Sequence, residues 1–142
     1  MTEQDPKALL SIGGKHLVEW QIAALLQSGV EEIVFVSGFN TERVENTLAA
    51  VAKDGGFALK MVHNPFYTVA DNISSCWLAR GEMTGDFMLL NGDTLFRAPL
   101  VARLLESPTA PVTLCVDQKD SYDQDDMKVY LDGTRLTDIG KT

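Results

Sequence analysis

The chain has 142 residues, of which 45% are apolar and 23% charged, a composition typical of one soluble globular domain with a sizeable core. Lys and Arg total 12 against 20 Asp and Glu, and the formal net charge of -8 disfavours a general affinity for nucleic acid or an anionic membrane. The sequence has no apolar run of membrane-spanning length, and its acidic start differs from the basic start of a signal peptide. We therefore expect a single cytoplasmic domain, residues 1–142, without nucleic-acid or membrane partners.

The cysteines and the standard catalytic motifs exclude several kinds of chemistry. Cys76 and Cys115 are far apart, in apolar surroundings, and are expected to be reduced core residues rather than a disulfide or zinc ligands. The chain has no Gly-x-x-x-x-Gly-Lys loop and no Gly-x-Ser-x-Gly elbow. P-loop and serine hydrolase chemistry are therefore disfavoured.

The first half of the chain alternates helical patterns with short apolar runs. Residues 16–28 carry one apolar stripe at helical spacing, so they predict a largely buried helix. The run at 33–36 is β-branched and aromatic, which is typical of a strand covered on both faces. A second helix is predicted after Asn40 and Thr41, and residues 57–62 are the next predicted strand.

The second half continues the alternation. Asp71 or Asn72 can cap a short helix, residues 87–90 predict a buried strand, and Pro99 suits the first turn of a further helix. Residues 112–116 predict a fourth central strand, after which residues 127–139 alternate around an Asp-Gly pair that is a strong hairpin signal. The fold class predicted is α/β, with a mostly parallel sheet, a C-terminal β-hairpin, and ligands bound beyond the carboxyl ends of the strands.

Asn91-Gly92-Asp93 directly follows the predicted strand at 87–90. A carboxylate at that edge suits Mg²⁺, which takes one or two protein carboxylates together with water and phosphate oxygens, and Gly92 would let a ligand approach the backbone closely. The alternative is a simple strand-to-helix turn in which Asp93 is a cap. The spacing alone favours neither interpretation.

Residues 71–75 place small hydroxyl and amide side chains at the start of a predicted helix. Exposed N–H groups at that point could bind a nucleobase edge or a phosphate, although capping by Asp71 or Asn72 is the more economical explanation. The acidic residues between 117 and 126 lack the spacing of a calcium loop and favour a solvated connection. The pattern by itself makes Lys128 and Lys141 ordinary surface lysines.

Several segments together resemble the nucleoside-diphosphate-sugar pyrophosphorylase and nucleotidyltransferase superfamily, and within it the phosphocholine cytidylyltransferase-like branch. The segments that carry the resemblance are Asp5 to Lys15, Leu26 to Val30, Glu32 to Phe39, Asn64 to Tyr67, Asp71 to Ser75, Trp77 to Arg80, Asn91 to Asp93, and Ile139 to Lys141. The resemblance implies a Rossmann-like three-layer fold. It also implies Mg²⁺-dependent transfer of a nucleotidyl group from an NTP, with CTP favoured, to a sugar-1-phosphate or phosphocholine-type acceptor, with release of pyrophosphate.

The resemblance implies roles for individual residues. Asp93 matches the metal-binding aspartate and Lys7 matches the lysine of a Pro-Lys signature that contacts phosphates. Lys141 matches the lysine that holds the acceptor phosphate, and completes the implied catalytic set. The nucleotide-binding positions implied are Asn72, Ser74 and Gly92, and Lys128 is a looser match to an acceptor contact.

The sequence departs from the family pattern at both flanks. The strand and glycine-rich loop that precede Pro-Lys are absent, and so are the segments after the hairpin that supply a second metal-binding aspartate. Loss of a central strand would expose strand edges and apolar surface, so we expect a homo-oligomer. The alternative function is a catalytically inactive module that acts in nucleotide binding or protein assembly.

Overall fold

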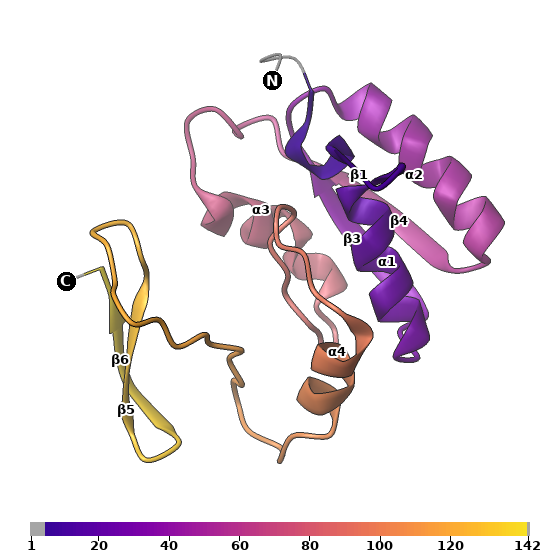
Figure 1. Ribbon diagram of the computed structural model, residues 1–142. Coiled ribbons are helices and arrows are strands. Elements are labelled where there is room, and N and C mark those ends of the chain that lie inside the picture. Colours follow the sequence, from indigo (N-terminus) through magenta and orange to yellow (C-terminus); the bar gives the residue numbers. More distant parts are fainter. Residues whose placement is uncertain (1–4, 142) are drawn as a thin grey trace. The chain divides into compact units, whose positions relative to one another are not determined.

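The computed structural model describes residues 5–141 and divides into two compact units, one up to Leu105 and the other from Glu106 (Figure 1). The second unit contains the hairpin strands β5 (Lys128–Asp132) and β6 (Arg135–Gly140). No helix within residues 5–141 combines the length and the apolar character needed to cross a bilayer. The elements of the first unit are η1 (Lys7–Leu9), β1 (Ser11–Ile12), β2 (Lys15–His16), α1 (Leu17–Gln27), β3 (Glu32–Ser37), α2 (Thr41–Gly55), β4 (Ala58–His63), α3 (Asn72–Ala79), η2 (Arg80–Glu82) and α4 (Ala98–Leu105).

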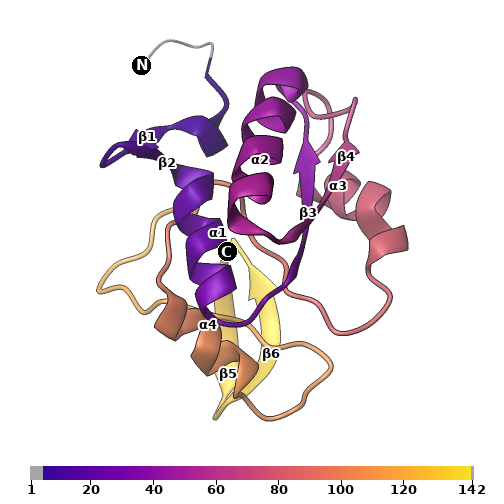
Figure 2. The same cartoon turned by 90° about the vertical axis from the view of Figure 1, so that its right-hand side faces the viewer.

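The centre of the first unit is a parallel strand pair covered by helices. β3 and β4 pair from Glu32 opposite Ala58 to Ser37 opposite His63, and α2 is the connection between them. Helices α1 and α2 lie on one side of the pair and α3 on the other (Figure 2). This arrangement confirms the layered α/β fold predicted from the sequence.

The core lies between α1, α2 and the strands, and its composition follows from the two sequence periods. Strand residues two apart point to the same face, and helix residues three or four apart share a stripe. Leu48 is fully buried, which contributes about 1.5–3 kcal/mol to folding. The buried members of the core are Ala8, Leu9, Val18, Ile22, Val44 and Leu48, and the strand residues packed against them are Ile33, Phe35, Leu59 and Met61.

The local signals place most element ends within a residue or two. Helix α2 is preceded by Asn40, which has left-handed backbone angles, and is followed by Gly56 at φ +66°. In the second unit, Asp132 pairs with Arg135 across a two-residue turn in which Gly133 has φ +61°. That turn requires a positive φ, which glycine adopts without strain. The hairpin prediction is confirmed.

Two predicted strands are wrong. Residues 87–90 and 112–116 have no strand partner among the described residues, and their apolar side chains are exposed rather than buried, apart from the half-buried Met88. Leu89, for example, is 66% exposed. An apolar run shows that a segment favours burial, but a strand also needs a neighbour for its N–H and C=O groups. Within residues 5–141, the strand that pairs with β3 is β4 and no other. The expectation that Cys115 is a core residue fails for the same reason, because Cys115 is exposed.

Candidate functional site

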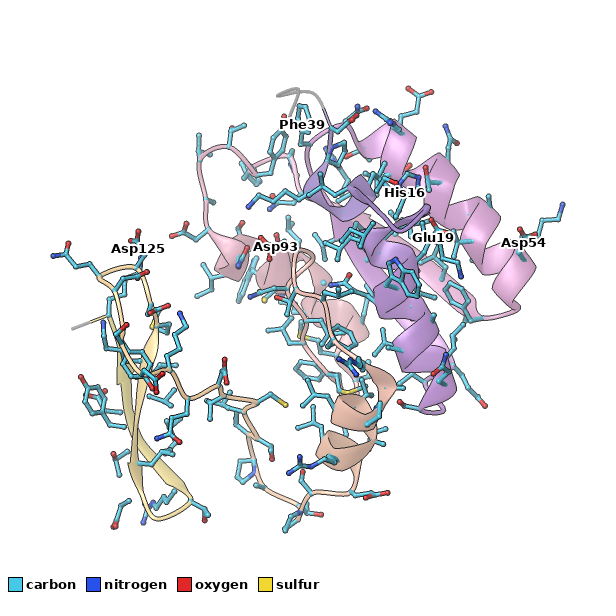
Figure 3. All side chains as sticks on the ribbon, in the orientation of Figure 1. His16, Glu19, Phe39, Asp54, Asp93 and Asp125 are labelled. Carbon is cyan, nitrogen blue, oxygen red and sulfur yellow. The ribbon has the colours of Figure 1, made fainter. Side chains whose placement is uncertain are left out.

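Asp93 stands in the middle of a tight turn between residues 91 and 94. The N–H of Thr94 donates to the carbonyl oxygen of Asn91 across the turn, at 3.4 Å. Figure 3 shows Asp93 at the tip of the loop that precedes α4. Its side chain is 49% exposed, so the carboxylate is accessible to solvent and to ligands.

Lys7 lies beside Asp93 although the two residues are 86 positions apart in the chain. The Lys7 Nζ atom is 3.2 Å from Asp93 Oδ2. The family resemblance implies complementary roles for these two residues, Lys7 toward phosphates and Asp93 toward a metal ion. The tertiary structure brings them into one charged pair on the surface of the first unit.

The backbone that carries Lys7 is anchored, whereas its ammonium group is exposed. The next two residues, Ala8 and Leu9, are buried in the core. The imidazole Nδ1 of His16 is 2.8 Å from the carbonyl oxygen of Leu9, which ties the short η1 turn to the start of α1. The Lys7 side chain is 76% exposed, so an anchored stretch of backbone presents to solvent an ammonium group that is paired with Asp93.

Because the pair of Lys7 and Asp93 is exposed to solvent, its two side chains are only weakly bound to each other. Ion pairs between solvent-exposed side chains contribute about 0–1 kcal/mol to folding, because water and salt screen them. Breaking the pair therefore costs little free energy, so Lys7 is able to bind a phosphate and Asp93 a cation instead of each other. A carboxylate oxygen with open space around it fits Mg²⁺, which keeps several waters and binds phosphate oxygens alongside one or two carboxylates. No group of three or more His, Cys, Asp or Glu residues within 5–141 is arranged to hold a metal.

The first turn of α3 is organised by a buried asparagine. Asn64, only 2% exposed, donates from Nδ2 to the hydroxyl oxygens of Ser74 at 3.1 Å and Ser75 at 3.0 Å. Its Oδ1 accepts from the N–H of Phe66 at 2.8 Å. Ser74 in turn donates to the carbonyl oxygen of Asp71 at 2.8 Å. The Ser74 hydroxyl, a predicted nucleotide contact, therefore already belongs to a local network.

The structure agrees only in part with the prediction that Asp71 or Asn72 caps this helix. Asp71 occupies the N-cap position of α3, but its side chain makes no capping hydrogen bond. Asn72 is the first helical residue and is exposed. Within residues 5–141, no hydrogen bond links Asn72 or Ser74 to Lys7 or Asp93. The roles of Asn72, Ser74 and Gly92 in nucleotide binding stay predictions.

In the second unit, the two predicted acceptor lysines have different surroundings. Lys128 Nζ donates to the carbonyl oxygens of Asp123 at 2.9 Å and Lys141 at 2.6 Å, so it holds the base of the hairpin together. Lys141 Nζ is 3.7 Å from Asp125 Oδ1, too far for a hydrogen bond, and its side chain is more than half exposed. Of the two, Lys141 has the ammonium group more open to a ligand.

The acidic segment of the second unit is stabilised by its own carboxylates. Asp123 Oδ1 accepts from the N–H groups of Asp125 at 2.8 Å and Asp126 at 2.9 Å. Lys119 donates to Asp126, and this hydrogen bond holds the pKa of the Asp126 carboxyl below its usual value. A hollow of about 540 Å³ lies within the same unit, and its lining includes Leu114, Val116, Tyr122, Lys128, Val129 and Ile139.

Gln21, Ser37 and Asn64 are buried polar residues for which the sequence predicted no individual role. Gln21 could have been singled out, because it interrupts the apolar stripe formed by Val18, Ile22 and Leu25 on α1. A polar side chain on the buried face of a helix is expected to have a hydrogen-bond partner in the folded protein. Asn64 gave no comparable signal, since a single asparagine before a proline also suits an exposed loop.

Comparisons with known proteins show which family the chain belongs to. Residues 1–124 match the MobA-like NTP transferase domain. The CMP-5'-(3-aminopropyl)phosphonate synthase of Streptomyces rubellomurinus is 31% identical over 105 residues, which are 74% of this chain and 16% of that protein. The choline-phosphate cytidylyltransferase of Streptococcus pneumoniae is 27% identical over 97 residues, which are 68% of this chain and 40% of that protein.

A solved structure supports the fold over nearly the full length. The inositol-1-phosphate CTP transferase from T. maritima superposes with a TM-score of 0.73 at 24% identity, covering 99% of this chain and 57% of that one. The chain spans less than half the length of the two sequence relatives described above. The family match covers the turn that carries Asp93, the η1 segment that carries Lys7, and both strands of the parallel pair. This chain belongs to the MobA-like NTP transferase domain family.

Proposed function

We propose that this domain transfers a cytidylyl group from CTP to a phosphorylated small-molecule acceptor. The observation that carries the proposal is the contact between Lys7 and Asp93, which places a cation and a hard oxygen ligand 3.2 Å apart on an accessible surface. In the reaction, an oxygen of the acceptor phosphate attacks the α-phosphorus of CTP. The bond from that phosphorus to the bridging oxygen breaks, and pyrophosphate leaves with the electron pair.

The protein's part in such a reaction is positioning and charge neutralisation rather than covalent chemistry. Lys7 binds the phosphate oxygens on which negative charge accumulates. Asp93 would hold Mg²⁺, the expected cofactor, which would neutralise charge on the triphosphate. The anchored η1 turn keeps the Lys7 backbone in place, so that only the side chain has to reorganise when the nucleotide binds.

The names of the relatives support cytidine as the base and an acceptor that carries a phosphate or phosphonate group. One is named a CMP-phosphonate synthase and another a choline-phosphate cytidylyltransferase. Asn72, Ser74 and Gly92 are the proposed nucleotide contacts. Lys141, whose ammonium group is open, is the proposed acceptor contact, together with Lys128, which is among the residues that line the hollow in the same unit. The volume of that hollow, about 540 Å³, suits a small molecule.

Pyrophosphate release tests the proposed function directly. With Mg²⁺ and either phosphocholine or a sugar-1-phosphate, we expect release to be faster with CTP than with UTP, GTP or ATP. Removal of Mg²⁺ by a chelator should stop it. If no combination of nucleotide and acceptor yields pyrophosphate while CTP still binds, the chain is an inactive nucleotide-binding module instead. If CTP neither binds nor reacts, the proposal fails.

We also propose that the chain forms a homo-oligomer. The segment at 87–90 is apolar and exposed, and one edge of β3 has no strand beside it among the described residues. Open strand edges and apolar surface favour association. Light scattering at micromolar concentration should give at least a dimeric mass, and Leu89→Glu should lower it. Val69→Glu is the matched control, because Val69 is 80% exposed and lies outside that segment. A monomeric mass for the unaltered chain would contradict the proposal.

A further inference from the structure

Gln21 is a buried polar residue that reaches the turn carrying Asp93. It lies on α1 and is 6% exposed. Its Nε2 donates to the carbonyl oxygen of Asn91 at 3.0 Å and to that of Thr94 at 2.7 Å. Both partners are carbonyls and can only accept, so the amide nitrogen of Gln21 must face them.

The two bonds hold the first and last residues of the turn. Asn91 opens the turn and Thr94 closes it, with Gly92 and Asp93 between them. The hydrogen bond within the turn is long, at 3.4 Å. A single side chain, fixed on a helix of the core, therefore sets the spacing between the two ends of the turn.

Little else in the neighbourhood constrains this turn. The segment before it, residues 87–90, has no strand partner within the described part of the chain. A Cβ built on Gly92 would meet no atom within 4 Å, so packing does not hold the middle of the turn. The contact from Lys7 to Asp93 is exposed and screened by solvent. Gln21 is thus the buried connection between the core and the Asp93 carboxylate.

We propose that Gln21 is a positioning residue: by binding both ends of the turn, it keeps the Asp93 carboxylate where a metal-bound nucleotide can use it. The inference rests on the proposed role of Asp93 and adds to it a residue that touches neither metal nor nucleotide. Groups that orient a metal ligand affect metal affinity strongly, typically about 10–100-fold when they are replaced. Asn91 and Thr94 are themselves exposed residues, whereas the side chain that binds their carbonyl oxygens is buried.

Gln21→Met tests the proposal, because methionine keeps the length and burial of the side chain and removes both donors. Ser28→Ala is the matched control. Ser28 is next to the C-terminal end of α1 and donates to the carbonyl oxygens of Ala24 at 2.9 Å and Ala98 at 3.2 Å, so it also ties α1 to a distant segment but not to the Asp93 turn. Amide chemical shifts are measured by NMR without ligand, and CTP affinity is measured by calorimetry with Mg²⁺.

In Gln21→Met, we expect the amide shifts of residues 91–94 to change and CTP affinity with Mg²⁺ to fall about 10-fold or more. Ser28→Ala should leave that affinity within about twofold, a difference of less than 0.5 kcal/mol. Gln21→Glu, which also removes the donors, should weaken binding at least as much. The proposal is overturned if Gln21→Met leaves the affinity unchanged, or if Ser28→Ala lowers it equally.

The proposed function of the domain and the proposed role of Gln21 can fail separately. If the unaltered chain binds no CTP, the proposed function fails and the role of Gln21 toward a nucleotide fails with it. The ligand-free amide shifts then still show whether Gln21 sets the geometry of the turn. If the unaltered chain binds CTP and Gln21→Met binds equally well, only the role of Gln21 is refuted.

Discussion

Asp93→Asn is expected to abolish the Mg²⁺-dependent part of CTP binding and to reduce pyrophosphate release on the order of 100-fold or more. The substitution keeps the shape of the side chain and removes its charge, so a metal ion loses its anionic ligand while the turn keeps its hydrogen bonds to Gln21. Calorimetric titration with CTP, with and without Mg²⁺, measures the first effect. A steady-state assay of pyrophosphate release measures the second.

The thermal stability of this variant separates a functional loss from a folding defect. The carboxylate is about half exposed, and its pairing with Lys7 contributes no more than about 1 kcal/mol. The unfolding temperature should therefore change by only a few degrees. Asp86→Asn is the control, because Asp86 is an exposed carboxylate seven residues earlier in the same loop. Equal nucleotide affinity in Asp93→Asn and the unaltered chain would remove Asp93 from the site.

Lys7→Met is expected to weaken CTP binding about 10–100-fold, which corresponds to the roughly 1.5–3 kcal/mol of a hydrogen bond to a charged group. Methionine retains the apolar stem and deletes the ammonium group that contacts Asp93. Lys7→Arg keeps the charge and should recover part of the affinity, although its planar head differs in geometry from an ammonium. Calorimetry at two salt concentrations should show a weaker salt dependence in the methionine variant.

Lys15→Met is the matched control for this prediction. Lys15 is an exposed lysine in the same N-terminal region, with its Nζ 5.2 Å from the centre of the Trp20 ring. Its removal lowers the net charge of the protein by the same amount but leaves Asp93 untouched. If Lys15→Met and Lys7→Met weaken CTP binding equally, Lys7 affects binding only through the net charge of the protein and not through a direct contact with the nucleotide.

The helices, the parallel strand pair and the hairpin were predictable because each has a local signal. The apolar stripe of α1, the β-branched run of β3 and the Asp-Gly turn between β5 and β6 all depend on residues within a few positions of one another. The choice of Asp93 as a candidate metal ligand also had a local signal, its place directly after an apolar run. Lys7 had none of its own, and only the resemblance to a family singled it out.

The wrong strand predictions concern segments whose secondary structure depends on a neighbour that is distant in the sequence. Residues 87–90 and 112–116 have the composition of buried strands, yet they are exposed and without strand partners among the described residues. The composition of a segment indicates how strongly it favours burial. Whether the segment forms a strand depends on whether another strand lies beside it to accept and donate its backbone hydrogen bonds. The same distinction explains Cys115, which has apolar neighbours in the sequence and an exposed position in the fold.

The sequence by itself determined the α/β class, the places of the helices and the hairpin, and the resemblance to a nucleotidyltransferase family. Only the tertiary structure decided that Lys7 meets Asp93 and that Gln21 holds both ends of the Asp93 turn. The physical reason is the range of the forces concerned. Hydrophobic period and backbone preference act over a few residues, whereas these contacts join positions 70 to 86 residues apart and exist only after the core has packed.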